Sequence, residues 1–71
     1  MKNRVKELRK QQNISQEALA RSVGVTRQTI TSIEVGKYTA SLLLAYKIAK
    51  FFNLTIEVVF LFEENQENIK S

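Results

Sequence analysis

Residues 15–36 read SQEALARSVGVTRQTITSIEVG and contain two short apolar-periodic stretches separated by a glycine. Ser15 and Thr26 each precede one of these stretches, where a side-chain oxygen can cap the first free backbone N–H groups of a helix. Gly24 and Gly36 each follow a stretch, at the place where a residue in the left-handed conformation usually ends a helix. The segment therefore predicts a helix, a short turn and a second helix.

Capping and stop signals of the same kind divide the rest of the chain into three more helical segments. Proline is absent, so the expected boundaries depend on Ser, Thr, Asn and Gly residues. The three segments are expected from Asn3 to Gln12, from a Ser41 cap through Phe52, and from a Thr55 cap over Ile56 to about Phe60. With the two helices of residues 15–36, they predict a compact, all-α, five-helix domain with short loops.

The chain after the fifth segment has no clear pattern. Residues 58–62, VVFLF, are β-branched and aromatic, so both a helix end and a short C-terminal β-strand fit them. Residues 63–71 are polar and typical of a frayed tail. We therefore expect the folded domain to cover residues 1–62, with the paired helices at 15–36, and the tail to cover residues 63–71.

The composition argues against several classes of function. The 71 residues contain no cysteine and no histidine, which removes disulfides, the usual metal sites and the common nucleophile–base pairs. There is no Gly-rich phosphate loop, and the longest apolar runs are far shorter than the roughly 18 residues of a membrane span. We expect no catalytic residues, no metal or other cofactor, no small-molecule ligand and no membrane partner.

The charge is distributed unevenly along the chain. Residues 1–50 contain ten Lys and Arg against three Glu, whereas residues 51–71 contain one Lys against four Glu. The net charge of +4 therefore combines a basic body with an acidic end. A basic body is typical of proteins that bind a polyanion, although an ordinary solvated surface gives a similar count.

The helix predicted over residues 26–35 has two contrasting faces. At about 100° per residue, Ile30 and Ile33 share one side of this helix, whereas Gln28 and Ser32 lie on the opposite side. Arg and Gln side chains pair with guanine and adenine edges, hydroxyls bond to either, and methyl groups contact thymine. Such a face, placed after a helix and a glycine turn, predicts a helix-turn-helix that reads the major groove of DNA.

The segment SQEALARSVGVTRQTITSIEVGKY resembles the helix-turn-helix core of Cro/cI-type (XRE-type) transcriptional regulators. The resemblance covers about Val5 to Phe60, and the stretch SLLLAYKIAKFFNLTIEVVF fits the fourth and fifth helices of that family. It implies a lambda-repressor-like fold with double-stranded DNA as the partner. It also implies that the helix over residues 26–35 is the recognition helix, which lies in the major groove.

The resemblance further implies roles for individual residues. The expected base contacts are Arg27, Gln28 and Ser32, with Thr31 and Thr26 beside them. The expected phosphate contacts are Gln16, at the start of the second helix, and the loop residues Lys37, Tyr38 and Thr39. Arg9 and Glu34 are expected to form a partly buried salt bridge that holds the recognition helix against the first helix.

The fourth helix carries more apolar surface than one small core needs. On a helical wheel with Leu42 at 0°, Ala45, Ala49 and Phe52 fall together as the expected core face, and Leu44, Ile48 and Phe51 form a second apolar stripe. A wide core under the fifth helix accounts for about half of this apolar surface, and the remainder indicates an interface. We expect a homodimer whose interface includes Phe51, Val58, Leu61 and Phe62, and a two-fold dimer predicts a palindromic site with half-sites about 10 bp apart.

Two functions remain open at this stage. The first is a sequence-specific transcriptional regulator, expected to be a repressor and, since the N-terminus lacks the apolar segment of a signal peptide, expected in the cytoplasm. The second is a DNA-binding antitoxin or another partner-regulated protein that uses the apolar C-terminal surface. RNA binding fits less well because there is no aromatic platform for stacking bases.

Overall fold

The computed structural model describes residues 2–60; Met1 and residues 61–71, including Leu61, Phe62 and the predicted tail, lie outside the described part. The described residues form α1 (Val5–Gln11), α2 (Gln16–Val23), α3 (Arg27–Glu34), α4 (Leu42–Phe51) and α5 (Ile56–Phe60). No strand forms within residues 2–60, so the prediction of an all-α fold with five helices is confirmed.

Four of the helices begin at the hydroxyl caps that the sequence predicts. Each hydroxyl oxygen accepts a hydrogen bond from the backbone N–H three residues later, which satisfies a donor that the helix itself leaves free. The four bonds run from Ala18 N to Ser15 Oγ (3.0 Å), Thr29 N to Thr26 Oγ1 (3.3 Å), Leu44 N to Ser41 Oγ (3.2 Å) and Val58 N to Thr55 Oγ1 (3.3 Å).

The first four helices end in one common way. Each is followed by a residue with positive φ, namely Asn13 (56°), Gly24 (78°), Gly36 (81°) and Asn53 (59°). The backbone N–H after each of these residues donates to a carbonyl five residues earlier, as in the bond from Lys37 N to Ser32 O (3.0 Å). This is the Schellman arrangement, and it turns the chain sharply so that loops of a few residues suffice.

The segment for which the sequence allowed a strand is helical in its described part. Val58, Val59 and Phe60 belong to α5, so the strand alternative is wrong for these three residues. Val59 N donates to Thr55 O at 3.2 Å, and the side chains of Val59 and Phe60 are buried in the core. Packing against the other helices has therefore overridden the β propensity of this short stretch.

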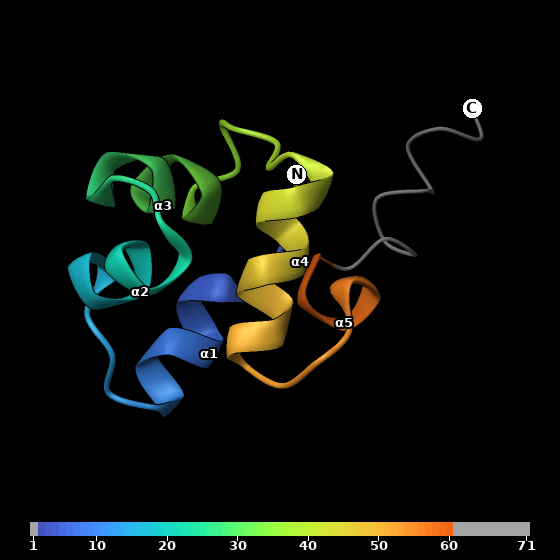
Figure 1. Cartoon of the computed structure of the whole chain (residues 1–71), viewed down its shortest axis with the longest axis horizontal. Coiled ribbons are helices and arrows are strands. Elements are labelled where there is room, and N and C mark those ends of the chain that lie inside the picture. Colours follow the sequence, from blue (N-terminus) through green and yellow to red (C-terminus); the bar gives the residue numbers. More distant parts are fainter. Residues whose placement is uncertain (1, 61–71) are drawn as a thin grey trace.

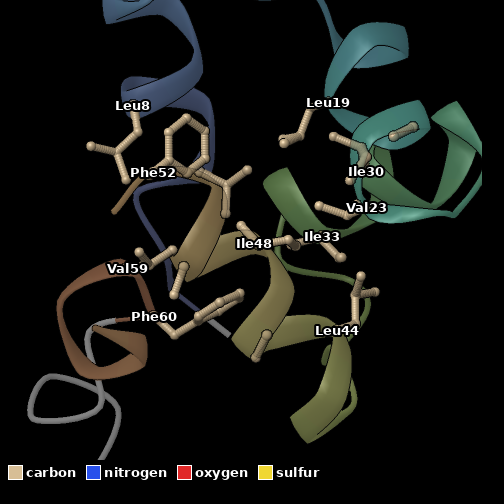
Figure 2. Packing of buried hydrophobic residues seen from close by; sticks show 14 residues of the cluster. Leu8, Leu19, Val23, Ile30, Ile33, Leu44, Ile48, Phe52, Val59 and Phe60 are labelled. Atoms are coloured by element: carbon tan, nitrogen blue, oxygen red, sulfur yellow. The ribbon is translucent and has the colours of Figure 1, made fainter. Parts of the chain in front are cut away.

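The core lies around α4, which separates the α2–α3 pair from α5 (Figure 1). Figure 2 shows side chains from all five helices meeting against α4, with Ile48 near the centre, Phe52 beside Leu8 of α1, and Val59 and Phe60 on α5. The core residues expected on this helix, Ala45, Ala49 and Phe52, are buried. Leu44 and Ile48 of the second apolar stripe are buried as well, so the core is wide, whereas Phe51 of that stripe is exposed.

Candidate nucleic-acid interface

The helix α3 is attached to the domain by its apolar face. Ile30 and Ile33 are fully buried against the core, and α3 packs mainly on α2 (Figure 1). The Thr26 cap fixes the start of the helix, and its hydroxyl also lies 3.1 Å from the hydroxyl of Thr29. Both hydrogen-bond partners of the Thr26 hydroxyl belong to Thr29, in the first turn of α3. The cap therefore sets the direction in which α3 leaves the turn.

The outer face of α3 carries polar groups that are free to bind a partner. Arg27 and Gln28 are exposed and Ser32 is half-buried, and none of these three side chains forms a hydrogen bond within residues 2–60. Thr31 is also exposed, but its hydroxyl is used internally: Oγ1 lies 3.1 Å from Gln16 Oε1 and 3.1 Å from the backbone oxygen of Arg27. The predicted base contacts therefore differ in their free groups and in their surroundings, because Gln28 and Ser32 border one hollow and Arg27 borders another, next to Gln16.

Gln16, the predicted phosphate contact, lies at the first position of α2 and reaches across to α3. Its Nε2 donates to Glu34 Oε1 at 3.0 Å, and its Oε1 accepts from Thr31 Oγ1. A side-chain amide has two N–H donors, so the second N–H of Gln16 stays available for a phosphate oxygen. The position is compatible with the predicted role and adds a link between the two helices.

The loop after α3 brings three further predicted contacts to the same surface. Lys37, Tyr38 and Thr39 are exposed, and the backbone N–H groups of Lys37 and Tyr38 both donate to Ser32 O, at 3.0 and 3.3 Å. Tyr38 borders a shallow hollow of about 260 Å³ together with residues of α3, its cap and its first turns: Thr26, Gln28, Thr29 and Ser32. The loop is thus held beside the outer face of α3.

Arg9 and Glu34 form the ion pair that the sequence predicts between α1 and the end of α3. Arg9 Nε donates to Glu34 Oε2 at 2.8 Å and Nη2 to Oε1 at 3.3 Å, while Nη1 donates to the backbone oxygen of Ile14 at 2.9 Å. The Glu34 side chain is only 3% exposed and that of Arg9 12%. The pair therefore ties α3 to both α1 and the loop that precedes α2.

Asn3 is a second tie that the sequence reading missed. Its Nδ2 donates to the backbone oxygen of Ile33 at 2.8 Å, and its Oδ1 accepts from Val5 N at 3.1 Å. One amide thus caps the start of α1 and binds a carbonyl at the end of α3. An Asn just before a helix is a recognised capping signal, but the contact with residue 33 has no signature in the local sequence.

Basic side chains gather at the start of α2, next to Gln16. A hollow of about 470 Å³ lies there. Its lining includes Lys6 and Lys10 of α1 and Arg27 of α3, together with Arg9, Ser15, Gln16 and Glu17. The first N–H groups of a helix favour an anion, and three cations around them strengthen that preference. The lysines of α1, which the sequence reading did not assign, therefore extend the basic surface beyond α2 and α3.

The fold and these contacts define a helix-turn-helix domain whose polar outer face belongs to α3. The sequence model of the helix-turn-helix family matches residues 5–59, so the chain belongs to that family. It is 58% identical over 64 residues to an uncharacterized HTH-type transcriptional regulator of Bacillus subtilis, which covers 90% of this chain and 97% of the relative.

Two archaeal relatives are similar to the chain over nearly the same length. An uncharacterized HTH-type transcriptional regulator of Methanocaldococcus jannaschii is 53% identical over 66 residues, which is 93% of this chain and all of the relative. One from Archaeoglobus fulgidus is also 53% identical over 66 residues, with 93% of each chain covered. The resemblance to XRE-type regulators is confirmed, and the chain is a DNA-binding transcriptional regulator of this type.

Within residues 2–60 no helix is both long and apolar enough to span a membrane. The same residues contain no group of three acidic, His or Cys side chains that could hold a metal ion.

Proposed function

We propose that this protein is a sequence-specific repressor that binds a palindromic duplex site as a homodimer in the cytoplasm. The observation that carries the proposal is the row of free polar groups on α3, where Arg27, Gln28 and Ser32 hold no partner within residues 2–60. These groups match the hydrogen-bonding edges of bases in the major groove. Repression needs nothing beyond occupancy, because a bound domain blocks access to the DNA that it covers.

The dimer is supported by apolar surface on the side of the molecule away from α2 (Figure 1). Tyr46 and Val58 are 50% and 39% exposed and, with Leu54, line a hollow of about 630 Å³ between α4 and α5. Phe51 is also partly exposed, and Leu42 and Leu43 extend the apolar surface along α4. A second copy related by two-fold symmetry would cover this surface and present a second α3 to the next turn of DNA.

Selection of bound sites from random duplex DNA tests the proposal directly. We expect an inverted repeat whose half-site centres lie about 10 bp apart. We also expect the logarithm of the binding constant to fall linearly with the logarithm of the salt concentration, with a slope of about 0.9 for each phosphate that the protein neutralises. A selected site without symmetry would argue against the dimer. Failure to enrich any sequence, or an affinity independent of salt, would argue against sequence-specific DNA binding.

Val58→Asp is expected to give a monomer with weaker binding to the full site. The change adds a charge beside the apolar side chains of the hollow between α4 and α5, whose lining also includes Lys50 and Glu57, and a second copy could then cover Val58 only by burying that charge. Sedimentation equilibrium measures the mass in solution. Val35→Asp is the matched control for the mass, because Val35 is the exposed C-cap residue of α3 and does not line this hollow, so its change should leave the mass unaltered.

A wild-type chain that is already monomeric would favour the alternative that this apolar surface serves another protein, as in a DNA-binding antitoxin. In that case the Val58→Asp chain would have the same mass and the same affinity for DNA as the wild type. The two outcomes separate a dimerising repressor from a partner-regulated DNA-binding protein.

A further inference from the structure

The hydroxyl of Thr31 is committed within the protein although its side chain is exposed. Oγ1 lies 3.1 Å from two acceptors, the side-chain oxygen of Gln16 and the backbone oxygen of Arg27. A hydroxyl has a single proton to donate, and both neighbours can only accept from it. Thr31 therefore has no proton to offer to a base edge while these bonds hold, and its side chain presents to a partner the methyl group and the acceptor lone pairs of the hydroxyl oxygen.

The buried ion pair fixes this arrangement. Gln16 could in principle point either end of its amide towards Thr31, but its other end faces the carboxylate of Glu34 at 3.0 Å. An ionised carboxylate only accepts, so the NH₂ group must face Glu34 and the carbonyl oxygen must face Thr31. Arg9 holds that carboxylate in place with two hydrogen bonds. The charge pair behind α3 thus determines which group Thr31 uses on the surface.

We propose that Thr31 determines specificity through its methyl group, by packing against the 5-methyl group of one thymine. The inference rests on the proposed role of α3 in base reading and adds the chemistry of one position. Arg27 and Gln28 carry free hydrogen-bonding groups for base edges, whereas the proton of the Thr31 hydroxyl is already used. Thymine presents the O4 acceptor and the 5-methyl group in the major groove, so Thr31, with no proton to donate, can contact it only through its methyl group. Contact between a Thr methyl and the thymine methyl is one of the ways in which proteins read the major groove.

Uracil differs from thymine only by the missing methyl group, so uracil replacement tests the proposal. Each thymine of the selected site is replaced in turn by uracil, and the dissociation constant is measured for three chains: wild type, Thr31→Ser and Thr31→Val. Serine keeps the hydroxyl and loses the methyl, whereas valine keeps the methyl and loses the hydroxyl. We expect uracil at one position to weaken binding of the wild type about fourfold, the contribution of one buried methyl group.

The variants then decide between the two groups of Thr31. We expect Thr31→Val to keep the uracil effect at that position and Thr31→Ser to lose it, while the effects at other thymines stay as in the wild type. The proposal is overturned if Thr31→Ser keeps every uracil effect, if no thymine is sensitive, or if Thr31→Val loses the effect while Thr31→Ser keeps it. Thermal unfolding of each variant checks that it is folded.

A failure of the proposed function is recognised separately. It shows itself earlier, as the absence of any selected duplex site for the wild-type chain. A selected site combined with uracil effects that do not depend on residue 31 would overturn only the role of Thr31.

Discussion

Arg9→Met is expected to lower the free energy of unfolding by about 3–5 kcal/mol, the cost of leaving a buried charge without its partner. The variant removes the only guanidinium that pairs with Glu34 in residues 2–60, and the Glu34 side chain is 3% exposed. A single core in a chain of this size provides about 3–5 kcal/mol in total. The variant should therefore be largely unfolded at 25 °C, which a urea titration followed by far-ultraviolet circular dichroism would measure.

Two further variants show whether the stranded charge is the cause. Arg9→Met combined with Glu34→Leu removes both charges and should recover much of the lost stability, because an apolar pair of similar volume replaces the ion pair. Glu17→Gln breaks the ion pair between Glu17 and Arg21, whose side chains are 65% and 79% exposed respectively. Because this pair is exposed, its loss should change the free energy of unfolding by less than about 1 kcal/mol. An Arg9→Met chain as stable as Glu17→Gln would contradict a structural role for the buried pair.

The helix boundaries could be predicted because their causes lie within a few residues of sequence. A hydroxyl cap needs only Ser or Thr at the right place, and the positive φ at Gly24 and Gly36 suits a residue without a Cβ. The same logic applies at Asn13 and Asn53, because Asn adopts the left-handed conformation more readily than most residues. Local chemistry was enough to define all five helices.

The width of the buried face of α4 shows where this local reasoning stops. Apolar residues occupy most of its positions, so the pattern alone does not show whether Leu44 and Ile48 belong to the core or to an interface. The choice depends on which side meets α2 and α5, and that is a property of the assembled domain. An almost uniformly apolar helix therefore requires the tertiary structure to identify its buried side.

The internal hydrogen bonds around the candidate site could not be predicted from the sequence. Arg27, Gln28 and Ser32 were identified from a helical face and a family resemblance; Arg27 and Gln28 are exposed and Ser32 is half-buried, and their contact with bases stays a prediction. The bonds of Asn3 to Ile33 and of Gln16 to Thr31 join residues 30 and 15 positions apart. No periodic pattern encodes such pairs, yet they determine which polar groups remain free for DNA.

Arg27→Ala is expected to weaken binding to the selected site by about 1–3 kcal/mol, or roughly five- to 150-fold, and to relax the preference at one base pair. The exposed guanidinium has no partner within residues 2–60, and a bidentate contact with guanine is the commonest use of such a group in the major groove. Gln28→Ala should have a similar effect at a different base pair. Repeating the site selection with each variant shows which base preference disappears.

Lys37→Ala provides the comparison that distinguishes reading from positioning. Lys37 lies in the loop after α3, where a phosphate contact carries no sequence information. Its loss should weaken binding to all sequences alike and lower the salt slope by about one, while the selected site stays the same. Arg27 also borders the basic hollow at the start of α2, so a phosphate contact is the competing role for it. If Arg27→Ala behaved like Lys37→Ala, with an unchanged site and a smaller salt slope, base reading would have to be assigned to the other proposed base contacts, without Arg27.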